Sequence, residues 1–259
     1  MHKPDSEPNP RNIRDIETIW PLLQQAHAGG AAEINAAQQA VLQRYRPAVY
    51  RYLLACLGNP NDADEVCQEF AFRFVRGDFR RADPEKGRFR DLLKSALYHL
   101  IIDFHKKKQR QGMAQLSPDA PEPADSEPST YDSDRQFLAS WRADLLNKAW
   151  EALADEEQRT GRPMHTVLQF RASHPEQRSA EMARHLTTQL GKEISDDWVR
   201  KWLKLARDRF AENLLLEVRA SLEKPTPDDV LQELVDLKLL EYCKDALETW
   251  RKRLDEEST

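Results

Sequence analysis

A short acidic segment contains the side chains best suited to binding another protein. In residues 61–75, NDADEVCQEFAFRFV, the spacing is helical, and Ala63, Val66, Cys67, Phe70 and Phe74 form one apolar stripe. Outside the stripe, three acidic side chains share one face and two polar ones lie beside it. A surface of this kind suits docking of a basic partner helix. The alternative is a solvated face near a helix N-terminus, where the helix dipole favours acids. The five side chains are Asp62, Asp64, Glu65, Gln68 and Glu69.

The next segment is basic, although the whole chain of 259 residues has a net charge of −5. Residues 76–111 hold eleven Lys or Arg and five acids, a local net charge of +6. Phe79, Phe89 and Tyr98 lie among these cations. Because cations bind phosphates and rings stack on unpaired bases, the mixture is typical of single-stranded nucleic-acid binding. The alternative is a core that holds the rings and leaves the charges in solvent.

The second half of the chain contains a second basic surface. Residues 178–190 and 194–218 have the apolar spacing of a helix–turn–helix. The second helix presents only basic side chains outward, which fits the major groove of duplex DNA. The expected core positions are Met182, Ala183, Leu186, Val199, either Trp202 or Leu203, Ala206 and Phe210. The outward positions are Arg200, Lys201, Lys204 and Arg207.

Catalytic and metal-binding patterns are missing from the sequence. Its seven histidines show no HExxH or Cys/His ligand spacing, and its three cysteines form no CxxC pair. The eight glycines form no dinucleotide-binding or phosphate-binding loop. We therefore expect a binding protein with no enzymatic activity, no cofactor and no metal. Because residues 1–20 lack the apolar core of a signal peptide and no apolar run is long enough to span a membrane, we expect a cytoplasmic location.

The elements that position these surfaces are predicted to be helices throughout, so the fold class is all-α. Residues 112–134 contain four prolines and six acids but no Lys or Arg, the composition of a flexible linker. Asn59 or Asn61 is expected to cap the helix that follows it. The predicted parts are a loose tail at 1–15, a helical domain at 16–111, the acidic linker at 112–135, a second helical domain at 136–222 and a helical extension at 223–259.

Two further helices are predicted to be amphipathic. In residues 89–111 the apolar face runs Leu92, Leu93, Ala96, Leu97, Leu100, Ile101 and Phe104, opposite Ser95, Tyr98, His99, Ile102 and Lys106. In residues 228–254 the stripe is Val230, Leu231, Leu234, Leu237, Leu240, Cys243, Leu247, Trp250 and Leu254, after a Thr226 cap and Pro227. Because residues 225–259 have a net charge of −5, this segment either packs on the second domain or covers its basic face.

Together these segments resemble a known family. Residues 20–110 resemble region two of bacterial sigma factors of the sigma-70 class, in particular the extracytoplasmic-function type. The stretches NPNDADEVCQEFAFRF and GRFRDLLKSALYHLIIDFHKKKQR carry this resemblance. Residues 140–218 are similar to the helix–turn–helix of region four, and the acidic linker falls where the family has one. The resemblance implies a protein that binds core RNA polymerase and directs promoter recognition and melting.

The resemblance also implies roles for individual residues. The β′ coiled coil of the polymerase would contact Asp62, Asp64, Glu65, Gln68 and Glu69. The melted minus-ten element would contact Phe79, Arg88, Phe89, Ser95, Tyr98, His99, Lys106, Lys107 and Arg110. The minus-35 element would contact Arg200, Lys201, Lys204 and Arg207. Besides core polymerase and promoter DNA, the implied partners include an inhibitor, either an anti-sigma factor or the C-terminal extension itself.

Two other functions fit parts of the sequence. A helix–turn–helix transcription regulator that acts without core polymerase would need only residues 140–220, and it leaves the acidic face at 62–69 unexplained. A sigma-like adaptor protein is the third possibility.

Overall fold

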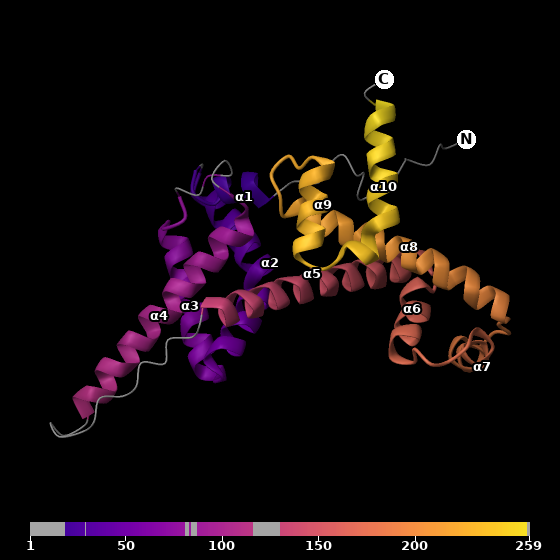
Figure 1. The fold of residues 1–259 in the computed structure, drawn as a ribbon, viewed down its shortest axis with the longest axis horizontal. Helices are drawn as coiled ribbons and strands as arrows, with labels where there is room; N and C mark the ends of the chain where they lie inside the picture. Colours follow the sequence, from indigo (N-terminus) through magenta and orange to yellow (C-terminus); the bar gives the residue numbers. More distant parts are fainter. Residues whose placement is uncertain (1–18, 29, 81–82, 84–86, 116–129, 258–259) are drawn as a thin grey trace. The chain divides into compact units, whose positions relative to one another are not determined.

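The computed structural model describes residues 19–28, 30–80, 83, 87–115 and 130–257, and these residues form helices without any strand. The all-α prediction is therefore confirmed (Figure 1). No described helix is both long and apolar enough to cross a membrane. The predicted tail at 1–15 and most of the predicted linker lie outside the described residues. The helices are α1 (Ile19–Gln25), α2 (Ala31–Leu57), α3 (Pro60–Arg76), α4 (Phe89–Gln115), α5 (Thr130–Thr160), α6 (Met164–Ser173), α7 (Ser179–Leu190), α8 (Asp196–Ala220), α9 (Pro227–Asp236) and α10 (Leu240–Glu257).

The chain divides into two compact units, which we describe separately. Unit 1 comprises residues 1–143 and 219–224, and unit 2 comprises residues 144–218 and 225–259. In unit 1, α1 and α3 pack on α2, and α4 packs on both α2 and α3. Helices α1 to α4 are the indigo to magenta group in Figure 1.

Helix α3 begins and ends at residues whose chemistry sets its limits. The side chain of Asn59 accepts hydrogen bonds from the backbone N–H groups of Asn61 and Asp62, and Pro60 occupies the first turn. At the other end, Gly77 adopts a left-handed conformation with φ 97°, which a residue with a side chain rarely adopts. The predicted apolar stripe, Ala63, Val66, Cys67, Phe70 and Phe74, is buried as expected.

The Asn59 cap leads to a stability prediction. We expect Asn59→Ala to lower the free energy of unfolding by about 1 kcal/mol, because two N–H groups lose their acceptor. The matched control is Asn61→Ala, which removes an exposed side chain of the same type and should change the free energy by less than about 0.5 kcal/mol. Urea unfolding of both variants tests this, and equal losses would mean that the cap contributes nothing specific.

An aromatic cluster ties the start of α5 into unit 1. The rings of Tyr45 and Trp141 stack with centroids 5.4 Å apart, and Phe89 lies 4.8 Å from Tyr45. Phe137 lies 5.3 Å from Tyr52, whose hydroxyl is 2.5 Å from the hydroxyl of Ser133. Trp141 is only 2% exposed, so this cluster is a central part of the core.

The structure differs from three predicted boundaries. The linker was expected to reach 135, but α5 already begins at Thr130, and α4 continues to Gln115. The second domain was expected to begin at 136, yet residues 136–143 belong to unit 1. The acidic composition suggested a solvated segment, whereas Ser133, Phe137 and Trp141 bury one face of the helix that follows.

Unit 2 contains the two helices predicted to form a helix–turn–helix, α7 and α8. Helix α7 ends at Gly191, whose φ of 65° turns the chain. Ser195 then caps α8 by accepting a hydrogen bond from the backbone N–H of Trp198. Of the two alternatives for the core, Leu203 is buried and Trp202 is half-exposed. The other predicted core positions are buried: Met182, Ala183, Leu186, Val199, Ala206 and Phe210.

The C-terminal segment is two helices rather than one. Thr226 caps α9 and Pro227 opens it, as predicted. The chain then turns at Lys238, which has a φ of 55°, before α10 begins. The turn buries Leu239, which the single stripe did not include, and leaves Leu231, Leu240 and Leu254 half-exposed. The remaining positions of the predicted stripe are buried: Val230, Leu234, Leu237, Cys243, Leu247 and Trp250.

Burial of Cys243 leads to a prediction about thiol chemistry. Burial raises the pKa of this thiol to about 12, so near pH 8 the native protein holds about a thousandfold less thiolate than an ordinary cysteine would. We expect thiol reagents to label Cys243 at least about a hundredfold faster in urea than in buffer. Its contribution to stability is complete below the ordinary thiol pKa near 9.0 and is lost as the pH rises through about 12.

The labelling is best measured in a Cys56→Ser/Cys67→Ser background, which leaves one thiol. Equal labelling rates in buffer and in urea would contradict the buried position of Cys243.

Candidate functional site

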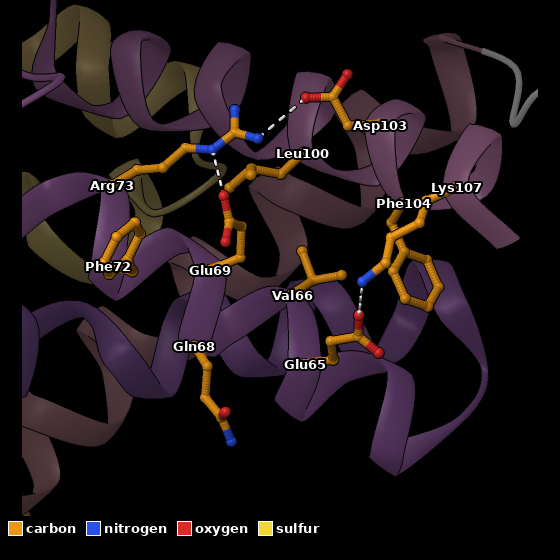
Figure 2. Close-up of a pocket in the computed structure, with 10 residues that line it drawn as sticks. All are labelled: Glu65, Val66, Gln68, Glu69, Phe72, Arg73, Leu100, Asp103, Phe104 and Lys107. Atoms are coloured by element: carbon orange, nitrogen blue, oxygen red, sulfur yellow. Dashed lines mark hydrogen bonds and ion pairs between the residues drawn. The ribbon is translucent and has the colours of Figure 1, made fainter.

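A groove of about 450 Å³ runs between α3 and α4 in unit 1 (Figure 2). Three of the side chains predicted to bind polymerase line it, and so does Lys107, which was predicted to bind DNA. The structure thus brings together two sets of residues that the sequence analysis treated as separate. The lining residues are Glu65, Val66, Gln68, Glu69, Phe72, Arg73, Leu100, Asp103, Phe104 and Lys107.

Ion pairs connect the two helices along this groove. The Nζ of Lys107 lies 2.8 Å from Glu65, and the Nζ of Lys108 lies 2.5 Å from Asp62. Figure 2 shows Lys107 reaching from α4 to Glu65 on α3. The hydrogen bond to Glu65 raises the pKa of Lys107. Ion pairs at the surface are weak because solvent screens them, so a binding partner could replace them at little cost.

Arg73 completes the network. Its guanidinium donates to Glu69 at 2.7 Å and to Asp103 at 3.2 Å (Figure 2). Helix α4 therefore contacts α3 through two lysines, which pair with acids of α3, and through Asp103, which pairs with Arg73 of α3. Among the predicted polymerase contacts, the three that face α4 are Asp62, Glu65 and Glu69.

Of the other two predicted polymerase contacts, Asp64 lies toward α2, and Gln68 borders both the α3–α4 groove and the α2 side. Asp64 and Gln68 are exposed and line a hollow of about 220 Å³ together with Leu42 and Arg46. The five predicted side chains therefore occupy both flanks of the exposed part of α3.

Two exposed apolar side chains beside this face were missed by the sequence analysis. Phe72 is 59% exposed and Val75 is 50% exposed. The guanidinium of Arg76 lies 5.7 Å from the centre of the Phe72 ring. Phe72 falls outside the apolar stripe of α3, and a large ring at such a position could have indicated from the sequence that it is exposed. An exposed aromatic ring with a neighbouring arginine is typical of a protein-binding surface.

The predicted minus-ten residues separate into exposed and covered groups. Ser95, His99, Lys106 and Arg110 are exposed on α4, and Tyr98 is half-exposed with its ring 5.9 Å from that of His99. These five side chains remain available for a ligand.

Phe89 corrects one prediction. Its ring is 3% exposed and packs against Trp20, Tyr45 and Trp141, so in this structure it cannot stack on a base. Phe89 is the first residue of α4 and points toward the core, so its ring fills a core position there.

The loop before α4 is described in part. Phe79 is half-buried, with its ring 5.7 Å from Phe70 and 5.5 Å from Phe74, and Arg88 is half-exposed. Residues 81–82 and 84–86, which include two of the predicted cations, lie outside the described residues.

In unit 2 the four predicted minus-35 side chains are exposed on α8. Arg200 donates to Asp196 at 2.8 Å and to Asp197 at 2.5 Å, so its charge is largely compensated within the helix. Lys201 has Asp197 one turn earlier, whereas Lys204 and Arg207 have no acidic residue one turn earlier.

Comparison with known proteins gives one match. Residues 41–111 match the family model of sigma-70 region 2. The matched part runs from the middle of α2 through α3 to near the end of α4, and it includes the α3–α4 groove. The chain matches neither a curated protein nor a solved structure. Residues 41–111, about a quarter of the chain, are therefore similar to region 2 of the sigma-70 family.

Proposed function

We propose that this chain is a sigma factor of the extracytoplasmic-function type, which binds core RNA polymerase and directs promoter recognition and melting at transcription initiation. The observation that carries the proposal is the coincidence of the region-2 match with the α3–α4 groove. Such a protein acts by binding in the cytoplasm and needs no cofactor or catalytic residue of its own.

The proposed polymerase contact is the exposed surface of α3. Asp64 and Gln68 offer a carboxylate and an amide, and Phe72 supplies an apolar anchor beside them. Asp62, Glu65 and Glu69 complete the surface by exchanging their present cations for those of the β′ coiled coil. The exchange is inexpensive because these pairs lie at the surface, and of the three acids only Asp62 is partly buried.

The proposed minus-ten contact is the exposed side of α4. Tyr98 and His99 provide rings for unpaired bases, and Lys106 and Arg110 provide cations for phosphates. Phe89 is left out because it is buried. Four further side chains complete the proposed contact: Phe79, Arg88, Ser95 and Lys107.

The proposed minus-35 contact is α8, through Arg200, Lys201, Lys204 and Arg207. The geometry of α7, its turn and α8 also fits a DNA-binding regulator that acts without polymerase. That function would leave the exposed surface of α3 without a role, so we favour the sigma factor.

Co-elution of the purified chain with bacterial core RNA polymerase on a sizing column tests the proposal. We expect a stable complex that also initiates transcription from promoter fragments selected with it. A folded chain that binds duplex DNA but not the polymerase would instead support the stand-alone regulator.

A further inference from the structure

Within unit 2, a second groove is lined by residues of α5, α6, α8 and α10. It has a volume of about 800 Å³, and Lys204 and Arg207 of α8 line it together with Glu241 and Asp245 of α10. Two of the four cations proposed to bind the minus-35 element therefore face the C-terminal extension. In Figure 1 the first turns of α10, in yellow, lie beside the middle of α8, in orange.

The two helices are in close contact at the bottom of this groove. The thiol of Cys243 lies 3.8 Å from the backbone carbonyl oxygen of Ala211, which is one turn beyond Arg207. Cys243 and Leu247 are buried, and α10 also packs on α9. The extension is thus an integral part of unit 2.

Charged side chains line both walls of the groove. On the α10 side, Glu241, Lys244 and Asp245 give a net charge of −1, and on the α8 side Lys204 and Arg207 lie beside Asp208 and Glu212. Among the described side chains, no ion pair joins Lys204 or Arg207 to Glu241 or Asp245. The two cations therefore remain exposed, with two exposed carboxylates nearby.

Duplex DNA would meet both a steric and an electrostatic obstacle here. The major groove is about 12 Å wide, and an α-helix with its side chains is about 10–12 Å across, so the groove admits one helix but not two. A duplex that seats Lys204 and Arg207 would press its phosphates against Glu241 and Asp245. Arg200 and Lys201, which lie one to two turns earlier on α8, do not line the α8–α10 groove.

We propose that α10 acts as a built-in screen that keeps duplex DNA away from Lys204 and Arg207 until α10 is displaced. This inference rests on the proposed DNA-binding role of α8. The screen formed by α10 would limit the free chain to weak duplex contacts through the first two turns of α8. It also differs from complete coverage of the basic face, which was one of the two expectations for the extension.

The test uses the full chain and a short mixed-sequence duplex, with binding followed by fluorescence anisotropy over a range of salt concentrations. The test variant is Glu241→Lys/Asp245→Lys. The matched control is Glu248→Lys/Glu256→Lys, which makes the same change in net charge at exposed α10 positions outside the groove. We expect the test variant to bind about tenfold more tightly than the control, with a log–log salt slope steeper by about two.

Adding Lys204→Glu/Arg207→Glu to the test variant should remove this gain, because the gain depends on those two cations. Equal binding by the test and control variants, or a gain that survives loss of the two cations, would overturn the screen. Co-elution with core polymerase depends on α3 and should be the same for all of these variants. It therefore reports separately on the proposed function.

Discussion

Reversing two charges on α3 is expected to abolish co-elution with core RNA polymerase. The variant is Asp64→Lys/Glu69→Lys, which places an ammonium on each flank of the proposed contact surface. Like charges set against a basic partner cost several kcal/mol, enough to reduce binding by about a hundredfold or more. Sizing chromatography of the chain mixed with core polymerase measures the effect directly.

The matched control is Glu151→Lys/Asp155→Lys, which makes the same change in net charge at exposed positions of α5 in unit 2. We expect this control to co-elute like the unaltered chain. Circular dichroism should show that both variants keep their helices, since Asp64 and Glu69 are exposed. If both variants lose the polymerase equally, the effect is one of overall charge and α3 is not the contact.

Trp141→Ala is expected to destabilise unit 1 by about 3–5 kcal/mol. The ring is 2% exposed and contacts Tyr45, Phe89 and Phe137, so its removal leaves a cavity among rings that cannot all move together. The loss should release residues 130–143 from α2 and α4. Urea unfolding measures the energy, and amide hydrogen exchange across 130–143 locates it.

Trp202→Ala is the natural comparison, because it removes the same side chain from a half-exposed position on α8. We expect it to cost no more than about 1–2 kcal/mol, in proportion to the smaller area buried. Equal losses for the two tryptophans would show that the aromatic cluster of unit 1 does not hold α5.

Local signals in the sequence determined most of the helices. Asn59 and Pro60 start α3, Thr226 and Pro227 start α9, and Gly191 ends α7, because caps and positive-φ residues act on the nearest turn alone. Apolar residues spaced three and four apart also identified the buried stripe of α3 and the core positions of α7 and α8. Such patterns depend only on the period of the helix and can be read without a structure.

The boundaries of the linker illustrate where composition misleads. Acids and prolines dominate residues 112–134, yet Ser133 within this segment is buried on the same helical face as Phe137 and Trp141, which follow it. A composition count over the whole segment is dominated by its acids and prolines, so it gives no sign that a single side chain such as Ser133 is buried. Burial depends on whether a complementary surface exists elsewhere, and here α2 provides Tyr45 and Tyr52.

For the candidate site, the sequence shows which helix carries which charges, whereas the packing of the helices sets which of these side chains meet. Phe89 and Phe72 are both rings among charged residues, but the first is buried against α2 and the second faces solvent. Lys107 and Glu65 are 42 positions apart, so the local sequence around either residue does not predict their 2.8 Å contact. Helical period and capping act over a single turn, whereas contacts between helices depend on how whole apolar faces pack, and that packing brings distant charges together.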